Sequence, residues 1–405
     1  MKFEAPPGTH DVLAKDWPHW QRIVREVEGL CRVYGYEPIT TPVFEDTELF
    51  LRTSGGGSDV VQKEMYTFDD RGERSLTLRP EGTAPIARAY LEHGLHRDPQ
   101  PQKLFTIAPM YRYARPQRGR YREHWHISVE AVGSADPAID AELIQLYDTL
   151  LGRLGVTEYR LDINTIGDAN CRPKYVEELV AWLQANDHLL DDEARQKRDT
   201  NPLRVFDVKK ENVRAALASA PDLSEYLCDE CRTHFESVKG FLDTYGVQYE
   251  LDSRLVRGLD YYTRTTWEFL GPEGGAQSTI SGGGRYDYLI EEIGGPPTPG
   301  VGFGAGVERL HLAMGDAEAH PQPVEAFFAV EDASRRPDVL RTMARLRADG
   351  YAVDTDYAER SLKGQLTQAQ RLAAEIVVIA HASGFTVRRS GQQDVELESL
   401  EDLEL

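Results

Sequence analysis

Residues 105–133 of this 405-residue chain read FTIAPMYRYARPQRGRYREHWHISVEAVG. Two extended, largely apolar runs flank a basic loop that contains Gly119, and this pattern predicts a long β-hairpin. From Arg112 to Arg122 there are five arginines and no acidic residue, although the whole chain has a net charge of −21. Guanidinium groups bind phosphate oxygens in pairs, so the loop indicates a polyphosphate site. A solvated hairpin tip is the alternative that this segment alone leaves open.

Outside this hairpin the sequence alternates between helical and extended patterns. An amphipathic helix is expected at 20–27, and an extended segment follows at 37–45, where two prolines favour a sheet edge or an interface. Helices are also expected from the EGTAP motif through Tyr90 and over 140–154. Further strands are expected at 75–79, 103–113, 126–132 and 159–164. Because these strands follow one another without regular crossover helices, they favour an antiparallel sheet over βαβ repeats.

Two more segments carry an arginine that needs a partner. In LVRGLDYYTRTTWEF, residues 255–269, Arg257 is expected on a strand between apolar residues. A charge there requires an anionic ligand or a salt bridge, for example with Asp260. In GVGFGAGVERL, residues 300–310, alternate glycines let a ligand approach the backbone, and Arg309 lies one turn into the following helix. No βαβ unit with a later acidic residue accompanies these glycines, so a dinucleotide site is not indicated.

The rest of the chain divides into an insertion and a last domain. Residues 168–246 are polar and rich in helical patterns, so we expect a helical insertion between two parts of the core, 1–167 and 247–318. In residues 322–405, short apolar runs alternate with helical patterns, which predicts a small α/β domain with a mostly parallel sheet. The fold class expected for the whole chain is α+β.

Composition excludes several classes of protein. No run approaches the roughly 20 apolar residues of a membrane span, and the N-terminus lacks a secretory signal, so a soluble cytoplasmic protein is expected. The negative net charge argues against a DNA partner, whereas the local basic patch leaves RNA open. Cys228 and Cys231 are the one clustered cysteine pair, and no second such pair or nearby histidine pair completes a zinc site. Two reduced cysteines on one helix turn, and no metal site, are therefore expected.

Together these segments resemble the class II aminoacyl-tRNA synthetases, and most closely the histidyl-tRNA synthetase family. The three class II motifs would correspond, in order, to Pro42, Arg112 and Arg309. The stretch LVRGLDYYTRTTWEF is similar to the family's own signature, as are RPEGT at 79–83 and RPQRGRYR at 115–122. The resemblance implies a class II catalytic core, in which helices flank an antiparallel sheet, and a C-terminal anticodon-binding domain. It also implies a homodimer that forms through the motif 1 strand.

The resemblance further implies a reaction and its residues. The chain would activate L-histidine with ATP, accompanied by Mg²⁺, and would transfer the histidyl group from histidyl-adenylate to tRNA-His. The catalytic residues would be Arg257, Arg112 and Arg309. Histidine would be bound by Glu81, Thr83, Arg112, His126, Glu130, Arg257, Tyr261 and Tyr262. ATP would be bound by Arg112, Arg120 and Arg309, and tRNA by Arg120, Arg122, Arg360, Lys363 and Gln365. For the last three residues a solvated helix start is the alternative.

Two positions depart from the family pattern. Ala114 stands where the family usually has a glutamate that accepts a hydrogen bond from the adenine amino group, so adenine recognition would rest on backbone groups or weaken. His126 stands where the family usually has a glutamine, and at low pH it would add positive charge beside a cationic substrate.

These departures keep a second hypothesis open, in which the chain is a noncatalytic synthetase paralogue. Such a paralogue would be a regulatory or histidine-sensing subunit, for example one that assists ATP phosphoribosyltransferase. Those relatives typically lack the anticodon-binding domain and have lost the intact RGLDYY signature. This sequence contains the signature and the segment that resembles the domain. A synthetase for another amino acid is a third hypothesis. Only the first hypothesis, an active histidyl-tRNA synthetase, predicts ATP-dependent charging of tRNA with histidine.

Overall fold

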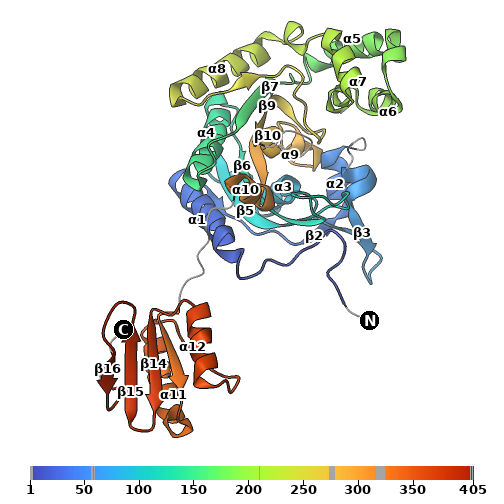
Figure 1. Cartoon of the computed structure of the whole chain (residues 1–405). Helices are drawn as coiled ribbons and strands as arrows, with labels where there is room; N and C mark the ends of the chain where they lie inside the picture. Colours follow the sequence, from blue (N-terminus) through green and yellow to red (C-terminus); the bar gives the residue numbers. More distant parts are fainter. Residues whose placement is uncertain are drawn as a thin grey trace. The chain divides into compact units, whose positions relative to one another are not determined.

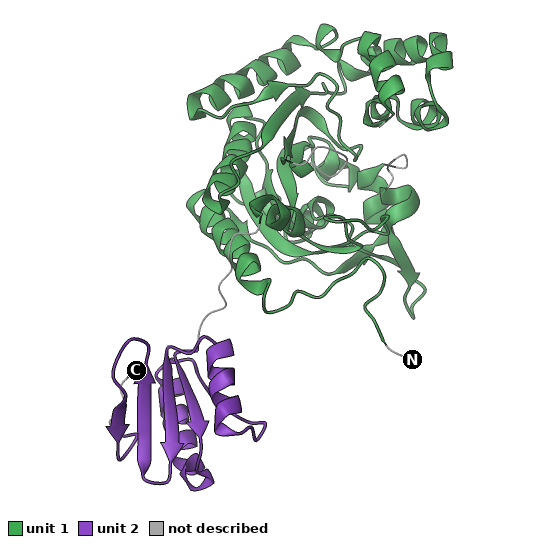
Figure 2. Cartoon of the chain, viewed as in Figure 1, with its two compact units in different colours: residues 1–317 green, residues 318–405 purple. Residues whose placement is uncertain are grey.

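The computed structural model describes residues 3–55, 58, 60–208, 210–272, 279–315, 324–401, 403 and 405. The chain forms two compact units, Met1–Ala317 and Glu318–Leu405 (Figure 1, Figure 2). The boundaries expected at 318 and 322 fall within 316–323, outside the described residues. Among the helices of the described ranges, none is long and apolar enough to cross a membrane.

An eight-stranded sheet forms the centre of the first unit. Its order is β1-β5-β6-β11-β10-β9-β7-β8. The strands are β1 (Glu37–Pro38), β5 (Gln102–Tyr111), β6 (Glu123–Val132), β7 (Arg160–Thr165), β8 (Glu250–Leu251), β9 (Thr263–Leu270), β10 (Thr279–Arg285) and β11 (Gly300–Gly306). The five inner pairs are antiparallel, and the two edge pairs, β1–β5 and β7–β8, are parallel. The predicted α+β class and antiparallel core are confirmed, and the predicted hairpin is the β5–β6 pair.

Helices cover both faces of this sheet. They are α1 (Trp17–Val33), α2 (Thr47–Ser54), α3 (Thr83–Glu92), α4 (Pro137–Leu154), α8 (Asp229–Tyr245), α9 (Leu289–Glu292) and α10 (Val307–Met314). Helices α1, α4 and α8 share one hydrophobic cluster with Val129 and Ala131 of β6. Helices α3 and α9 share a second cluster with Val132, which points to the opposite face because successive side chains of a strand alternate.

The same alternation along β6 positions the polar residues of the site. Ile127 and Val129 are fully buried in the first cluster, between the sheet and helices α1 and α4. His126 and Glu130 therefore point to the other face of the sheet. The buried face fixes the register of β6, and the register in turn fixes which polar side chains are presented together.

The extended segment expected at 37–45 is two short strands that belong to different sheets. Strand β1 ends at Pro38, and β2 (Phe44–Asp46) belongs to a three-stranded sheet with β4 (Ser75–Leu78) and β3 (Tyr66–Asp69). Pro42 lies between them, outside any strand. Proline has no N–H to donate to a ladder, which explains the break. As expected, β1 is an edge strand.

The expected insertion, between β7 and β8, consists of helices and short turns. Helices α5 (Arg172–Ala185), α6 (Asp192–Thr200) and α7 (Glu211–Ala216) follow β7, and α8 returns to the sheet. Figure 1 shows α5, α6 and α7 grouped side by side, and α8 packs against α4. Apolar residues of these helices, including Leu179, Leu183 and Val213, belong to the second cluster. The insertion thus shares a hydrophobic core with the eight-stranded sheet.

The second unit is a five-stranded sheet with the order β13-β12-β14-β15-β16. Its elements are β12 (Ala326–Val330), α11 (Arg336–Ala348), β13 (Val353–Thr355), α12 (Leu362–Arg371), β14 (Ile376–His381), β15 (Gly384–Arg389) and β16 (Val395–Leu397). The first three strands are parallel, as predicted, but β15 and β16 add two antiparallel pairs. The sheet is therefore mixed, because the sequence after His381 turns back in a hairpin that the sequence analysis did not include.

Candidate active site

A cleft of about 430 Å³ lies on the face of the sheet to which His126 points. It is bordered by the β5–β6 hairpin, by β10 and β11, and by the loop before β9. Of the residues predicted to bind histidine or ATP, the cleft is lined by Glu81, Thr83, Arg112, Arg120, His126, Arg257, Tyr261, Tyr262 and Arg309. Glu130 lies directly behind this lining. Side chains from segments far apart in the sequence thus meet in one cavity.

Four arginines line the cleft, and three of them, Arg112, Arg120 and Arg309, have positive charges that lie close enough to repel one another. Arg112 follows β5, Arg120 lies in the hairpin loop, and Arg309 lies in the first turn of α10. Burial lowers the pKa of Arg309, and the charges of Arg112 and Arg120 lower it further. Within the described residues, Arg120 is the one of the three with a carboxylate partner, Glu64, at 2.6 Å. An excess of half-buried positive charge is an anion-binding arrangement, and it suits the phosphates of a nucleotide.

Backbone carbonyls hold two of these arginines in place. Arg309 donates to the carbonyl of Gly119 at 3.1 Å and to that of Thr279 at 2.6 Å. Arg112 donates from Nε to the carbonyl of Pro80 at 2.7 Å. These bonds fix the direction of each guanidinium without neutralising its charge. The remaining N–H groups can therefore meet a ligand without a large loss of side-chain entropy.

Arg257 lies in the loop between β8 and β9, so its predicted position on a strand was wrong. The strand ends at Leu251 because Asp252 starts a turn. The Asp252 carboxylate accepts a hydrogen bond from the N–H of Arg254 at 3.0 Å, a side-chain bond that competes with strand pairing. The loop carries Arg257 over the sheet, where it lines the cleft.

The partner of Arg257 is Glu268 of β9. It is not Asp260, the candidate from the sequence, whose carboxylate accepts a hydrogen bond from Asn201 at 2.7 Å. Burial is the largest single influence on the pKa of Arg257 and lowers it, but Glu268, Tyr262 and Asp207 together outweigh burial and raise it. Gly282 of β10 makes room for the guanidinium, because a Cβ there would lie 2.2 Å from Nη2 of Arg257. A fixed cation is thus held against the sheet surface.

Two buried carboxylates, Glu81 and Glu130, lie on either side of Thr83 in the hydrogen-bond network. Glu81 accepts hydrogen bonds from the N–H groups of Thr83 at 2.6 Å and Ala84 at 2.9 Å, at the start of α3. Glu130 accepts from the hydroxyls of Thr83 at 2.8 Å and Tyr286 at 2.6 Å. Burial raises the pKa of both, that of Glu130 to about 8. They are suited to receive a cationic ligand, because a nearby positive charge favours the ionised carboxylate.

Glu130→Gln is expected to stabilise the ligand-free protein more at about pH 8 than at about pH 5. The pKa of Glu130 is raised from 4.5 to about 8 in the folded protein. Below pH 4.5 the Glu130 carboxyl group is protonated in both the folded and the unfolded protein. Between pH 4.5 and about 8 only the unfolded protein loses this proton, so the free energy of unfolding falls as pH rises. Each pKa unit corresponds to about 1.4 kcal/mol. Melting temperatures at both pH values measure the effect, with the exposed Glu291→Gln as the control. An equal change at both pH values would contradict the assigned titration.

Tyrosines form an aromatic wall of the cleft. The ring centroids of Tyr261 and Tyr262 are 4.6 Å apart, and those of Tyr261 and Tyr286 are 5.9 Å apart. Burial raises the pKa of all three phenols, so they stay protonated and can donate hydrogen bonds. The sequence analysis missed Tyr286 and Glu268. The signal for Glu268 was available, since it is an acidic residue within the otherwise uncharged run TTWEFL.

His126 is neutral in this site. Burial lowers its pKa to about 3, with further contributions from the charges of Arg112 and Arg309. Its Nδ1 lies 3.0 Å from the hydroxyl oxygen of Ser128. The positive charge that His126 was expected to add at low pH therefore requires a pH near 3, because protonation beside two arginines in a buried position is costly. The other departure, Ala114, lines the cleft as a small apolar surface.

Among the residues predicted to bind RNA, Arg122 does not line the cleft. Its guanidinium lies 3.8 Å from the ring centre of Tyr113 and donates to the carbonyl of Pro7 at 3.3 Å. This contact fixes the hairpin loop against the N-terminal segment.

The predicted RNA contacts of the second unit differ from one another. Arg360 is exposed and pairs with Asp356, and Lys363 is exposed. Gln365 is buried, and its amide binds the backbone N–H of Val330 at 2.7 Å and the carbonyl of Val330 at 2.9 Å. We therefore withdraw Gln365 as an RNA contact. It connects α12 to β12, because a buried amide must find partners within the protein.

Comparison with known proteins identifies the family. Residues 8–310, well over half of the chain, match the family model described as histidyl-tRNA synthetase. The chain belongs to the histidyl-tRNA synthetase family. A histidine–tRNA ligase from Geobacillus kaustophilus is 48% identical over 386 residues, which cover 94% of this chain and 90% of that protein. One from Caldanaerobacter subterraneus is 45% identical over 382 residues, which cover 94% of this chain and 92% of that protein.

Solved structures agree with this membership of the histidyl-tRNA synthetase family. Apo histidyl-tRNA synthetase from S. aureus matches with a TM-score of 0.81 and 33% identity, and the match covers 98% of both chains. An ATP phosphoribosyltransferase regulatory subunit/histidyl-tRNA synthetase from Bacillus halodurans matches with a TM-score of 0.66 and 23% identity. At that identity the second match shows a shared fold alone. The class II architecture is thus common to both structures.

Proposed function

We propose that this chain is a histidine–tRNA ligase that forms histidyl-adenylate from L-histidine and ATP and transfers the histidyl group to tRNA-His. One observation carries the proposal: a single cleft contains convergent arginines and, beside them, buried carboxylates. The arginines suit a triphosphate, and the carboxylates suit an amino acid with two positively chargeable groups. The curated relatives that match nearly the whole chain are named histidine–tRNA ligase, which supports the same assignment.

In the first step, a carboxylate oxygen of histidine attacks the α-phosphorus of ATP. A phosphorus–oxygen bond forms, the bond from that phosphorus to the bridging oxygen breaks, and pyrophosphate leaves. Arg112 and Arg257 would stabilise the charge that develops at the α-phosphate, and Arg309 would hold the γ-phosphate end. Their backbone and carboxylate anchors keep them oriented before ATP arrives. Catalysis then needs position and charge, with no side-chain nucleophile.

Histidine would be recognised by the carboxylates and tyrosines of the cleft. Glu81 and Glu130 would meet the α-ammonium and the imidazole, with Thr83 between them. Tyr261 and Tyr262 would supply a flat wall and hydroxyl donors. Recognition through buried polar groups rejects apolar amino acids of similar size, because such a ligand would leave these groups unpaired.

In the second step, the terminal ribose hydroxyl of tRNA would attack the carbonyl carbon of the adenylate, and AMP would leave. Arg120 and Arg122 of the hairpin would contact the acceptor end, where phosphate contacts position the RNA. The second unit would bind the anticodon, with Arg360 and Lys363 as exposed cations. As an enzyme that charges tRNA, the protein would work in the cytoplasm.

Mg²⁺ belongs to the proposal as the ion that accompanies ATP. Mg²⁺ is usually held by substrate phosphates together with one or two carboxylates. Glu308 lines the cleft next to Arg309, and burial raises its pKa to about 7. A divalent cation would favour the ionised form of Glu308, so this donor fits. When bound, the ion would offset charge on the pyrophosphate oxygens.

A homodimer is supported by exposed apolar side chains next to Pro42. Val43 and Phe44 are 40% and 50% exposed, and Phe68 of β3 is 42% exposed. The rings of Phe44 and Phe68 lie edge to face at 6.3 Å. Phe44→Asp is expected to convert the dimer to a monomer in light scattering, because it places a charge in the interface. Phe241→Asp, at an exposed position of α8, is the control. A monomeric wild-type protein would contradict the dimer.

Histidine-dependent exchange of labelled pyrophosphate into ATP tests the function, with each of the twenty amino acids assayed separately. Exchange with histidine alone, followed by charging of tRNA-His, is the expected result. Exchange with a different amino acid would make the chain another synthetase. If folded protein that binds histidine gives no exchange with any amino acid, the regulatory paralogue replaces this proposal.

His126→Gln is expected to preserve or improve the affinity for histidine. His126 is neutral in the cleft, and glutamine also offers a donor and an acceptor, so the hydrogen-bonding capacity is kept. The Michaelis constant for histidine in the exchange assay measures the effect. His124→Gln, at the neighbouring cleft position, controls for general disturbance of β6. If the Michaelis constant for histidine rises strongly in His126→Gln but not in His124→Gln, the imidazole of His126 has a role of its own.

A further inference from the structure

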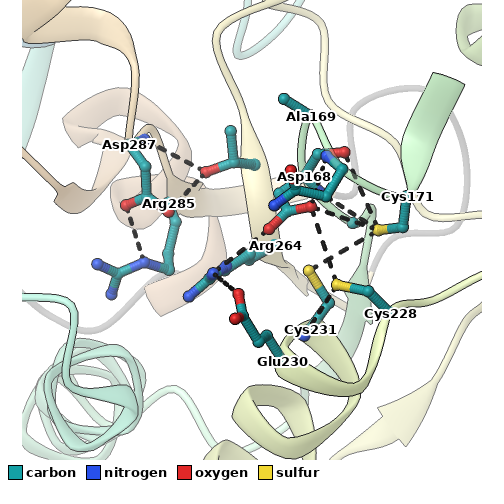
Figure 3. Close-up of polar contacts among 12 residues, drawn as sticks. Asp168, Ala169, Cys171, Cys228, Glu230, Cys231, Arg264, Arg285 and Asp287 are labelled. Carbon is teal, nitrogen blue, oxygen red and sulfur yellow. Dashed lines mark hydrogen bonds and ion pairs between the residues drawn. The ribbon is translucent and has the colours of Figure 1, made fainter. Parts of the chain in front are cut away.

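Four potential metal ligands meet where the insertion joins the sheet. They are Asp168, Cys171, Cys228 and Cys231 (Figure 3). The Sγ atoms and one carboxylate oxygen all lie within 4.8 Å of one another. Asp168 and Cys171 come between β7 and α5, and the two other cysteines open α8. The sequence analysis treated Cys228 and Cys231 as an isolated pair, because Cys171 is far away in the sequence.

Three distances within this cluster are close to those of a tetrahedral zinc site. Cys171 Sγ lies 3.8 Å from Cys231 Sγ and 3.6 Å from Asp168 Oδ1, and Cys228 Sγ lies 4.0 Å from Asp168 Oδ1. Zinc bonds of about 2.3 Å to sulfur and about 2.0 Å to oxygen place neighbouring sulfurs about 3.8 Å apart and sulfur and oxygen about 3.5 Å apart. A small inward movement of the side chains would complete the tetrahedron.

Other roles for the sulfurs fit less well. All three cysteines are free thiols, and 3.8 Å between Cys171 and Cys231 is far from the disulfide length of about 2.05 Å. Apolar packing does not explain Asp168, a carboxylate that is only 2% exposed among the sulfurs. Arg264 pairs with Oδ2 of Asp168 and offsets part of the cost of burying this charge, whereas Oδ1 faces the sulfurs. Three thiolates and one carboxylate are a donor set that selects zinc over magnesium or calcium.

Backbone N–H groups point at two of the sulfurs. The N–H of Asp168 lies 3.4 Å from Cys171 Sγ, and the N–H of Cys231 lies 3.5 Å from Cys228 Sγ. Cys228 is also the N-cap of α8, where the helix dipole favours negative charge. Both features stabilise thiolates, the form in which cysteine binds a metal.

A second layer of contacts orients the carboxylate. Arg264 Nη2 lies 3.3 Å from Asp168 Oδ2, the oxygen that a metal bound to Oδ1 would leave free (Figure 3). Arg264 has a φ of 46°, a left-handed conformation that is costly for a residue with a side chain. Such strain persists where the surroundings require it, and here it brings the guanidinium to Asp168. Partners of this kind commonly orient metal ligands.

The loop that carries Cys171 also supports the cleft. A Cβ at Gly167 would lie 2.7 Å from Cys171 Sγ, and Gly167 has a φ of 64°, so glycine is required there. Next to the cysteine, Arg172 donates to the carbonyls of Gly167 at 3.0 Å and Tyr262 at 2.7 Å. The cluster is therefore linked through one side chain to the backbone of a residue that lines the cleft.

We infer that Asp168, Cys171, Cys228 and Cys231 form a structural zinc site that closes the base of the helical insertion. The zinc would join the beginning of α5 to the beginning of α8 and so close the long loop between them. Cross-links that close long loops stabilise by reducing the freedom of the unfolded chain. The inference is independent of the proposed ligase activity, because its test measures metal.

The test is the zinc content of the full-length protein, purified without chelators and also reconstituted with zinc and dialysed. About one zinc per chain is expected, as for a closed site with four protein ligands. Cys228→Ser should lose this zinc, whereas Cys31→Ser should keep it, since Cys31 is buried in α1 away from the cluster. Chelation should lower the melting temperature of the wild-type protein and of Cys31→Ser by similar amounts.

Cobalt substitution identifies the ligands even if Cys228→Ser does not fold. Cobalt-loaded wild-type protein should show sulfur-to-cobalt charge transfer and the strong visible bands of a tetrahedral site. Asp168→Cys should keep the metal and increase the charge transfer, because it adds a fourth thiolate. The inference is overturned if the reconstituted wild-type protein retains no stoichiometric zinc. A cobalt spectrum that Asp168→Cys leaves unchanged would overturn it equally.

Discussion

Arg257→Ala is expected to lower histidine-dependent pyrophosphate exchange by about 10³-fold or more while the chain stays folded. Arg257 is a fixed cation in the cleft, held by Glu268 and accommodated by Gly282. Its charge is needed most when negative charge develops at the α-phosphate, so its loss should reduce kcat more than it changes the Michaelis constants. Exchange kinetics measure the loss of activity, and circular dichroism measures whether the chain stays folded. If Arg257→Ala exchanges pyrophosphate at nearly the wild-type rate, the proposed mechanism is contradicted.

Two further variants separate the chemistry from the loss of an ion pair. Arg257→Ala leaves the half-buried Glu268 without its ion-pair partner, which destabilises the protein by itself. Combining Arg257→Ala with Glu268→Gln should restore the melting temperature but not the exchange activity. Arg254→Ala, in the same loop and outside the cleft lining, should leave kcat unchanged. Recovery of activity in the double variant would mean that Arg257 acts only through stability.

Arg112→Ala is expected to lower kcat for exchange by about 10²- to 10³-fold, the usual loss when one oriented donor is removed from a developing negative charge. Arg112 is held by the carbonyl of Pro80 and, among the described residues, has no carboxylate within ion-pair distance. Its charge is therefore available to a phosphate. The Michaelis constant for ATP should also rise, because in the proposed mechanism Arg112 would contact the nucleotide before and during the reaction. Steady-state exchange at varied ATP measures both constants.

The matched control for Arg112 comes from the same hairpin. Arg115 is exposed and does not line the cleft, so Arg115→Ala removes the same charge from the same loop. It should leave adenylate formation unchanged. If both variants lose activity equally, the hairpin acts as a general electropositive surface, and the specific role of Arg112 is excluded.

The sequence by itself determined the main elements of the catalytic unit. The β5–β6 hairpin, its arginine-rich loop and the glycine-rich strand β11 that leads into α10 were all predicted from local patterns. These patterns are decided within a few residues, because strand alternation, proline and glycine act on their own neighbourhood. Alternation along β6 also explains why His126 and Glu130 share a face. The family resemblance rests on the same local motifs.

Only the tertiary structure decided which distant groups meet. The pairing of Arg257 with Glu268, the inward turn of Gln365 and the meeting of Cys171 with Cys228 each join separate elements. The same holds for pKa values, since His126 is neutral because of burial and two arginines from other segments. The partner of a side chain depends on burial, charge and distance in the folded protein. The spacing of residues along the sequence does not contain these quantities.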